Sequence, residues 1–481
     1  MDNKLVKNYI YSVLYQMLLV ITPFITTPYL TRVMGLEVLS INTWTANLAQ
    51  WFVLFGIMGV NIYGNREIAR VRDNQADLTK TFWEIFTMQF ISMIISSLVY
   101  VGFLFLNNSD YFLYLALQGI TLFSVALDIT WFFYGVEDFK KASLRNMFVK
   151  LFGIALIFIF VKGPNDLVKF ILINTLSGVL GQIIMWVQLR HYIGFCRVNL
   201  AGVMRHFKPN IGLFIPQIAI SVYSVLDITM LGYLGPRLEE VNLYEQAQKF
   251  VKMFLFFITS IGSVMLPRVT NVFHKGNYEQ VNAYLTKTLK FALYMSIPMI
   301  CGIVGMIQNF IDWFLPVSYA PVGNMIIATS PIILFISLSN VFGTQFMVPT
   351  GDTKHYTISV VCAAILNFMI NFTLIPYLGA YGAIIGSVAA EASVTIIQWF
   401  FVKDKIKITI GIKELLKIII SSLLIIVPVR YTGVWLGANI LSNLAQVVVG
   451  IVVYVAFLLM LKADFLVEMY HSFKQRGLKN G

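Results

Sequence analysis

Several charged side chains interrupt the long apolar stretches of this sequence. Asp227 lies in one stretch, and Glu245, Lys249 and Lys252 lie in the next. A charge inside hydrocarbon is costly, so each of these groups is expected to face protein or a water-filled cavity. Glu245 precedes Lys249 by about one helical turn, and Lys252 follows on the same helical face. Two interpretations fit this pattern. In the first, Asp227, Glu245 and Lys249 form ion pairs that hold two helices together. In the second, the lysines form a cationic surface that attracts an anionic headgroup, and the carboxylates tune or gate this surface.

Four further charges stand at the ends or in the interior of other apolar stretches. Arg32 ends the first stretch, and contact with lipid headgroups explains its position. Arg66 ends the second stretch, where it either guards an inside vestibule or belongs to an ordinary basic loop. Asp128 lies in the inner half of the fourth stretch and Glu391 near the middle of the twelfth. Either carboxylate is a candidate for binding a proton or cation in a coupled cycle, and a hydrogen bond to a neighbouring helix explains Glu391 equally well. The residues assigned to gating or ion coupling are Asp128, Asp227, Glu245 and Glu391.

The elements that carry these charges are predicted to be membrane-spanning helices. Of the 481 residues, 58% are hydrophobic and only 12% are charged, which is about half the charged share of soluble domains. Apolar runs of about 20 residues recur along the chain, each long enough to cross the hydrocarbon as a helix and too continuous for a barrel strand. We therefore expect an all-α integral membrane protein with about fourteen transmembrane helices. The expected centres are Leu19, Phe52, Met93, Phe123, Ala155, Ile173, Ser221, Phe254, Pro298, Phe335, Leu366, Ala390, Ile420 and Val449.

The distribution of basic residues predicts the orientation in the membrane. With the N-terminus inside, about 28 of the 35 Lys and Arg residues fall in or beside inside segments, such as 140–150. Both termini are therefore expected to be cytoplasmic. The same rule explains the net charge of +12, so we do not expect nucleic acid as a partner. Cys196, Cys301 and Cys362 lack the spacing of metal ligands and are interpreted as ordinary small apolar residues.

An internal repeat relates the two halves of the chain. The segment 29–52 resembles the segment 229–252, and a weaker echo sets Gly135 against Gly351, each of which opens the loop after the fourth helix of its half. The offset contains six spans, an even number, so both halves enter the membrane from the same side. Duplicated bundles of this kind usually bind substrate between their halves and rock one half against the other, which favours a transporter, although a channel could share the symmetry.

The repeat predicts three parts. We expect one six-helix lobe over residues 1–200 and a second over residues 201–405. Two additional transmembrane helices and a cytoplasmic tail are expected over residues 406–481, outside the repeat.

Motifs for ATP hydrolysis and metal catalysis are missing from the sequence. No Gly-Lys dipeptide occurs, which excludes a Walker A loop, and neither His-Glu-x-x-His nor Cys-x-x-Cys is present. The outer loops are too short to form a catalytic domain. We expect no enzyme activity, no cofactor and no metal. The energy for transport would come from an ion gradient, the membrane potential or the substrate's own gradient.

Four segments resemble the bacterial polysaccharide transporter family, and in particular its Wzx-type flippases of lipid-linked oligosaccharides. WFFYGVE at 131–137 resembles the family's W-F-F-x-G-x-E stretch, and YGNREIA at 63–69 resembles its Y-G-x-R-E-I-A. MLPR at 265–268 and IPYLGAYGA at 375–383 also fit, so that the resemblance covers nearly the whole chain. The family shares a superfamily with MurJ and the MATE exporters.

The resemblance implies a flippase that moves an undecaprenyl-diphosphate-linked oligosaccharide repeat unit from the inner to the outer leaflet of the bacterial cytoplasmic membrane, for surface polysaccharide assembly. It also implies alternating access between two lobes around a cationic lumen. Ala49 and Phe52 occupy the places of the two lysines in the first lobe, so the cationic site would belong mainly to the second. The candidate lumenal cations for the anionic headgroup are Lys249, Lys252, Arg32 and Arg66.

The expected partners are the lipid-linked oligosaccharide, membrane lipid and a candidate polysaccharide polymerase, and the chain is expected to be a monomer. Two other classes of membrane protein fit part of the sequence. A MATE-like ion-coupled exporter of small molecules shares the superfamily, but usually has twelve helices and an acidic lumen. A membrane glycan polymerase or ligase would need a sizeable outer loop, which is missing here.

Overall fold

The computed structural model describes residues 3–107, 109–406 and 410–463, and over these residues its regular secondary structure is entirely helical. The all-α membrane fold expected from the apolar runs is confirmed. A helix satisfies its backbone hydrogen bonds internally, as the hydrocarbon interior requires. Most of the expected cytoplasmic tail, residues 464–481, lies outside the described residues.

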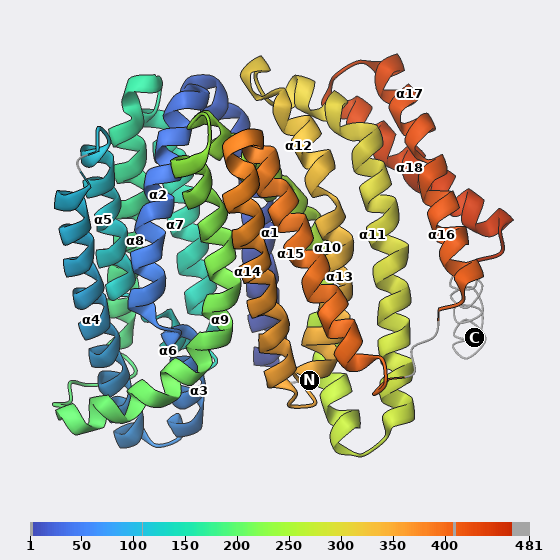
Figure 1. Cartoon of the computed structure of the whole chain (residues 1–481). Coiled ribbons are helices and arrows are strands. Elements are labelled where there is room, and N and C mark those ends of the chain that lie inside the picture. Colours follow the sequence, from blue (N-terminus) through green and yellow to red (C-terminus); the bar gives the residue numbers. More distant parts are fainter. Residues whose placement is uncertain (1–2, 108, 407–409, 464–481) are drawn as a thin grey trace. The chain divides into compact units, whose positions relative to one another are not determined.

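The chain divides into two compact units, of which the first is Met1–Gly232. Figure 1 shows its long helices side by side, with α3, α6 and the first part of α9 gathered at one end. Its elements are α1 (Asn3–Val33), α2 (Gly35–Ile57), α3 (Val60–Val71), α4 (Gln75–Leu106), α5 (Phe112–Ala126), α6 (Thr130–Gly135), α7 (Phe139–Phe160), η1 (Pro164–Asp166), α8 (Leu167–Leu189) and α9 (Leu200–Leu234).

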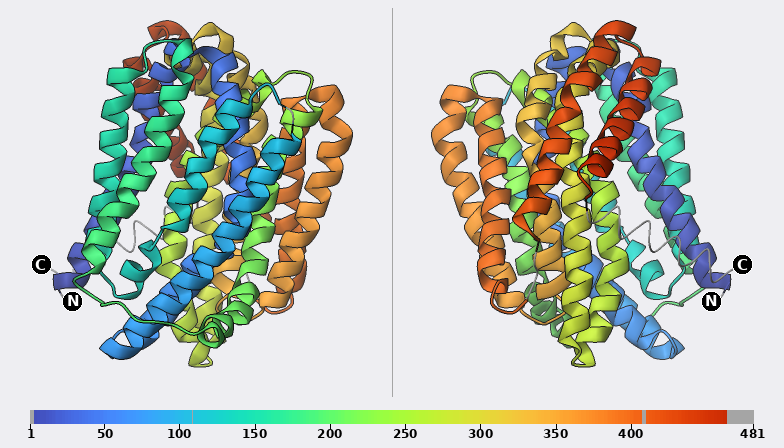
Figure 2. Two further views of the ribbon diagram at one scale, coloured as in Figure 1. Left: turned by 90° about the vertical axis from the view of Figure 1, so that its left-hand side faces the viewer. Right: turned by 90° about the vertical axis from the view of Figure 1, so that its right-hand side faces the viewer.

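The second compact unit is Tyr233–Gly481. Within it, α17 and α18 pack along α11, as Figure 2 shows in its right-hand view. Its elements are α10 (Glu239–His274), α11 (Tyr278–Phe314), η2 (Val317–Tyr319), α12 (Pro321–Thr329), α13 (Pro331–Ser339), the π-helix η3 (Asn340–Met347), α14 (Thr353–Leu378), α15 (Ala380–Val402), α16 (Ile412–Leu424), α17 (Ile426–Leu436) and α18 (Ile440–Met460).

Nine helices among the described residues are long and apolar enough to cross a membrane. The helices Val317–Thr329 and Pro331–Met347 form a bent pair, and the number of candidate spans is ten if this pair crosses the membrane as one span. The helices α1, α9 and α10 have 31, 35 and 36 residues, and such helices are about 45 to 55 Å long. The expected number of fourteen spans stays a prediction.

The two most specific family-like motifs pack against each other in the first unit. A Cβ at Gly64 of α3 would lie 2.6 Å from the Trp131 ring, and a Cβ at Gly135 of α6 would lie 2.5 Å from Ile68. Only glycine lets the backbones of α3 and α6 approach this closely. Trp131 and Phe132 are at most 1% exposed and belong to the main core of the unit. The motifs are therefore first of all a packing device.

The helix α9 belongs mostly to the first compact unit, because the division falls at Gly232, near its end. The sequence places the lobe boundary at residue 200, at the start of this helix. Arg205 and His206 explain the difference, since they tie the first part of α9 to α4 and α3. The lobe boundaries and the arrangement as six plus six plus two helices stay predictions.

Candidate functional site

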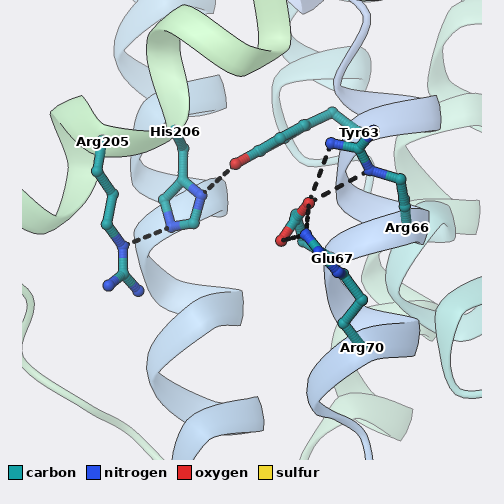
Figure 3. A network of polar contacts seen from close by, with 6 residues as sticks. All are labelled: Tyr63, Arg66, Glu67, Arg70, Arg205 and His206. Atoms are coloured by element: carbon teal, nitrogen blue, oxygen red, sulfur yellow. Dashed lines mark hydrogen bonds and ion pairs between the residues drawn. The ribbon is translucent and has the colours of Figure 1, made fainter.

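A chain of polar side chains links α3, α4 and α9 in the first unit. The Tyr63 hydroxyl lies 2.6 Å from His206 Nδ1, and His206 Nε2 lies 3.1 Å from Glu84 Oε2. The same carboxylate oxygen accepts a hydrogen bond of 2.5 Å from Arg205. Figure 3 shows Tyr63 reaching from α3 towards His206 and Arg205 on α9.

Glu84 is the buried carboxylate among these linked polar side chains. Its side chain is only 1% exposed, whereas that of Arg205 is 54% exposed. A buried carboxylate needs charged or hydrogen-bonding partners, which Arg205 and His206 supply. Burial lowers the pKa of His206 below its ordinary value, while the hydrogen bond with Glu84 acts in the opposite direction. The imidazole is therefore neutral at pH 7, and its two nitrogens lie between the Tyr63 hydroxyl on one side and Glu84 and Arg205 Nε on the other.

Two more arginines on α3 lie beside this chain, as Figure 3 shows. Glu67 accepts hydrogen bonds of 3.2 Å from both Arg66 and Arg70. The Arg66 guanidinium lies 5.8 Å from the centre of the Tyr63 ring. Both arginine side chains are at least half exposed. One carboxylate shared by two guanidinium groups leaves an excess of positive charge, so this face can bind an anion such as a phosphate.

Two local breaks in the backbone position α3 and α4. Met58 and Gly59 have positive φ values of 47° and 78°, and they separate α3 from α2. Asn74 caps α4 by accepting hydrogen bonds from the amides of Ala76 and Asp77. As a result α4 starts directly after α3 and packs against it.

The expected lysine face lies on α10 in the second unit. Lys249 Nζ lies 2.9 Å from Glu245 Oε1, as their spacing predicts, and the lysine side chain is 48% exposed. Lys252 is exposed and makes no hydrogen bond or ion pair with another described residue. On another face of α10, Tyr244 is buried and its hydroxyl lies 2.8 Å from Ser387 Oγ on α15. Tyr244 therefore packs towards α15, whereas Lys249 and Lys252 are exposed.

The other expected residues are spread over both units. Asp227, on α9, is 2% exposed and falls in the first unit, whereas Glu391, on α15, is 8% exposed and falls in the second. Arg32 is exposed in the last turn of α1, where it donates a hydrogen bond of 3.0 Å to the Pro28 carbonyl. Such a bond is typical of a basic residue at a helix C-terminus. The roles of these residues in binding, gating or ion coupling stay predictions.

Asp128 lies at a break in the expected fourth helix, between α5 and α6. Its Oδ1 accepts hydrogen bonds from the amide of Thr130 at 2.9 Å and from its hydroxyl at 2.5 Å. The Thr130 hydroxyl in turn accepts from Arg145 at 3.0 Å, and Arg145 also donates to Gln182 at 3.3 Å. Arg145 is only 9% exposed, although the sequence assigns it to the basic inside segment 140–150. The first unit therefore holds a buried cation of its own.

Glu84, His206 and Arg145 are not among the residues predicted from the sequence. Glu84 lies on the long helix α4, seven residues after Asp77 and directly before the continuous apolar run, so the criterion applied to Glu391 would also have found it. His206 carries no local signal, because Tyr63 and Glu84 are 143 and 122 residues away in the chain. Arg145 is hidden among other basic residues that follow the positive-inside pattern.

An apolar cleft of about 470 Å³ lies in the second unit between α11 and the last two described helices, α17 and α18. The residues that line it are almost all hydrophobic, and such a surface suits a hydrocarbon chain. They include Pro298, Met299, Met306, Val429, Val447 and Tyr454.

Two family sequence models match the chain. The family described as "Polysaccharide biosynthesis protein" matches residues 5–273, which is more than half of the chain. The family described as "MatE" matches residues 213–373. The first match covers the chain of polar side chains on α3, α4 and α9, as well as the lysine face of α10.

Two curated relatives carry the name "Putative O-antigen transporter". The protein of Shigella dysenteriae is 23% identical over 384 residues, which cover 79% of this chain and 96% of that protein. The protein of Escherichia coli strain K12 is 24% identical over 412 residues, which cover 83% of this chain and 96% of that protein.

A solved structure of the lipid II flippase MurJ, in an inward closed conformation, has the same fold. Its TM-score is 0.75 at 16% identity, and the match covers 96% of this chain and 100% of that chain. Together with the apolar helices, this likeness identifies a multi-pass membrane protein with the fold of that structure. The resemblance found in the sequence motifs is confirmed. Because the family model matches more than half of its length, the chain belongs to the polysaccharide biosynthesis protein family.

Proposed function

We propose that this protein moves an undecaprenyl-diphosphate-linked oligosaccharide repeat unit from the inner to the outer leaflet of the bacterial cytoplasmic membrane by alternating access. The observation that carries the proposal is the match, over 96% of their length, to two proteins named "Putative O-antigen transporter", within the polysaccharide biosynthesis family. These relatives are named as transporters, so we propose movement of the substrate and no catalytic step. We place both termini in the cytoplasm on the distribution of Lys and Arg.

The lysine face of α10 supports an anionic substrate. Lys249 and Lys252 expose two ammonium groups about one helical turn apart, with Glu245 as the partner of the first. Lysine is a compact point charge, suited to a phosphate that must bind and then leave. In our proposal these lysines receive the diphosphate, and Glu245 competes with it for Lys249.

The exposed arginines beside Tyr63 support a second contact with the anionic headgroup, in the first unit. Arg66 and Arg70 share Glu67, while Arg205 is held by Glu84. In the expected orientation this end of the unit faces the cytoplasm, where the substrate is made available. We assign these arginines to capture of the headgroup before translocation.

The apolar cleft between α11, α17 and α18 supports a lipid-linked substrate. A polyprenyl chain has no polar groups, and the cleft walls are apolar in the same way. We assign the last two helices to holding this chain while the headgroup moves. The coupled ion, for which Asp128, Asp227 and Glu391 remain candidates, would drive the cycle.

The test is leaflet translocation of undecaprenyl-diphosphate oligosaccharide in proteoliposomes. Lys249→Ala/Lys252→Ala is compared with the native chain and with Lys287→Ala/Lys354→Ala, which removes two exposed lysines elsewhere in the second unit. We expect the first variant to lose about tenfold or more in initial rate, since hydrogen bonds to charged groups contribute roughly 1.5 to 3 kcal/mol, and the control to keep its rate. A native chain that moves none of several such lipids would overturn the proposal.

A small-molecule exporter is the second candidate, because the MatE family model matches residues 213–373. Such a protein would exchange a cationic dye for sodium ions or protons. Dye exchange by the purified chain, in the absence of lipid translocation, would favour this candidate. Acidic rather than basic exposed groups would then carry the site, so Glu245→Gln would impair exchange and Lys252→Ala would not.

A further inference from the structure

A second cleft, of about 800 Å³, opens on the first unit between α4, α8 and the segment that follows α8. Its aromatic rings contact one another: the ring centres of Phe86 and Trp186 are 4.7 Å apart, and those of Trp83 and Phe195 are 5.1 Å apart. Such edge-to-face packing holds the walls in place. The aromatic residues that line the cleft are Trp83, Phe86, Phe90, Trp186 and Phe195.

The polar groups of these rings are already used. Trp83 Nε1 donates a hydrogen bond of 2.9 Å to the Gly194 carbonyl, and Trp186 Nε1 donates one of 2.9 Å to the Leu127 carbonyl. A sugar would therefore find almost no hydrogen-bonding partner on these walls, whereas a hydrocarbon chain would find a continuous apolar surface. Among the described residues that line the cleft, Arg190 is the one with a charged side chain.

Arg190 lines the cleft and is exposed. It is the residue directly after α8, and Trp186 lies four residues earlier. Because α8 belongs to an apolar candidate span, its end marks the level at which the chain leaves the hydrocarbon, where tryptophan and arginine are enriched. The segment between α8 and α9 then crosses α4, as the left-hand view of Figure 2 shows, and closes one side of the cleft.

We propose that this cleft binds one anionic phospholipid of the surrounding bilayer. Its acyl chain lies against the rings of Trp83 and Trp186, and its phosphate binds Arg190. A zwitterionic lipid fills the same apolar space but carries no net charge to complement the guanidinium, so the site prefers the anionic lipid. The proposal depends on the membrane fold alone and not on the transported substrate.

The experiment measures quenching of tryptophan fluorescence by phospholipids with brominated acyl chains, because bromine quenches only on contact. The contribution of the cleft is the difference between the native chain and Trp83→Phe/Trp186→Phe, which keeps aromatic walls. We expect brominated phosphatidylglycerol to reach half-maximal quenching at about a fivefold lower concentration than brominated phosphatidylcholine, the factor expected for one basic residue near an anionic surface.

Arg190→Gln is expected to remove the preference and to leave quenching by both lipids in place, because the apolar walls remain. Arg197→Gln, in the same segment but outside the cleft, is the matched control and is expected to keep the preference. Native mass spectrometry of the native chain and Arg190→Gln gives a second readout, in which retained phosphatidylglycerol should decrease in the variant. Equal quenching by both lipids, a preference that survives Arg190→Gln, or displacement by undecaprenyl diphosphate and not by phosphatidylglycerol would each overturn the proposal.

Discussion

Asp138 and Asp352 occupy the same position of the same turn, one in each compact unit. The amide of each aspartate donates a hydrogen bond of 2.9 Å to the carbonyl five residues before it. The preceding residue has a positive φ in both turns, 59° at Glu137 and 76° at Gly351. Both turns are therefore Schellman motifs, which end one helix just before the next begins.

Each aspartate also accepts a hydrogen bond from the segment that follows the next two helices, which form a hairpin. Asp138 accepts a hydrogen bond from Tyr192, three residues after the end of α8. Asp352 accepts one of 2.6 Å from Lys405, three residues after the end of α15. Burial acts to raise the pKa of Asp352, but the hydrogen bonds from Lys405 and His355 lower it below its usual range. The hairpins α7–α8 and α14–α15 are thus closed in the same way.

This equivalence differs by two residues from the echo found in the sequence. The sequence echo places Gly135 against Gly351, whereas the turns place Glu137 against Gly351, an offset of 214 residues (352 − 138). With this offset, Thr130 also falls on Thr344. The two turns therefore share their backbone geometry although the side chains at Glu137 and Gly351 differ.

Gly351→Ala should destabilise the second unit. A Cβ at this position has open space around it, so the cost comes from the left-handed backbone alone and is expected to be about 1 kcal/mol. Gly102→Ala is the matched control, because Gly102 lies in a helix with ordinary φ and equally open space. Apparent melting temperatures in detergent should fall for the first variant and stay level or rise for the second. An unchanged melting temperature for Gly351→Ala would mean that the turn tolerates another backbone conformation.

Gly64→Ala and Gly135→Ala should each destabilise the first unit more than Gly351→Ala affects the second. The new methyl group would lie 2.6 Å from Trp131 in one variant and 2.5 Å from Ile68 in the other. Overpacking of this kind costs about 1 to 3 kcal/mol. Limited proteolysis and melting in detergent measure the effect. Native stability in both variants would show that α3 and α6 can separate without loss.

Fold class and part of the lysine site can be predicted from the sequence because they depend on local patterns. Continuous apolar runs predict helices wherever the solvent is hydrocarbon. The spacing of Glu245 and Lys249 predicts their contact, since residues four apart are neighbours on a helix. The glycines of the two motifs mark the places where α3 and α6 approach each other most closely.

The polar chain on α3, α4 and α9 cannot be predicted in this way. Glu84 and His206 meet only because α4 and α9 fold together, and one sequence gives no signal for such a pair. The break at Asp128 is also hidden, because the apolar run continues through it while the backbone turns. Arg145 follows the positive-inside pattern and yet lies inside the unit, where Thr130 and Gln182 hold it.

Acidification should destabilise the first unit through His206. The pKa of this group is lowered by burial in the folded chain, so the unfolded chain, with the ordinary value of 6.5, binds the proton first as the pH falls. The stabilising contribution is present in full above pH 6.5 and is lost as the pH falls towards the folded-state value. His206→Gln should show a smaller loss of stability between pH 7 and about pH 5.

Melting in detergent across this pH range measures the contribution of His206 as a difference between native and variant chains. His274→Gln is the control, because His274 is exposed near the end of α10 and should leave the pH profile unchanged. Parallel profiles for the native chain and His206→Gln would contradict the prediction.

Lys252→Ala should impair transport more than Lys249→Ala does. Lys249 is already paired with Glu245 at 2.9 Å, whereas Lys252 has no such partner among the described residues. Glu245→Gln should release Lys249 and lower the apparent KM for the lipid-linked oligosaccharide. Initial rates in proteoliposomes, with Lys287→Ala as the control, decide the order. Equal effects of the two lysine substitutions would mean that the ion pair does not compete with the substrate.

Asp128 and Arg145 should be energetically coupled through Thr130. The carboxylate of Asp128 accepts from the Thr130 hydroxyl, which accepts from Arg145, and the two charges also attract each other. Asp128→Asn keeps an acceptor for the turn but removes the negative charge that compensates the buried Arg145. We therefore expect Asp128→Asn and Arg145→Gln each to destabilise the unit, and the double variant to lose about 1 to 3 kcal/mol less than their sum.

The same variants separate a structural role of Asp128 from ion coupling. If Asp128 only compensates Arg145, the double variant regains stability and its transport keeps the native dependence on pH and on sodium ions. If Asp128 binds the coupled ion, Asp128→Asn and the double variant both lose that dependence, whatever their stability. Additive losses of stability would contradict the coupling itself and would leave Arg145 compensated by the neutral groups Thr130 and Gln182 alone.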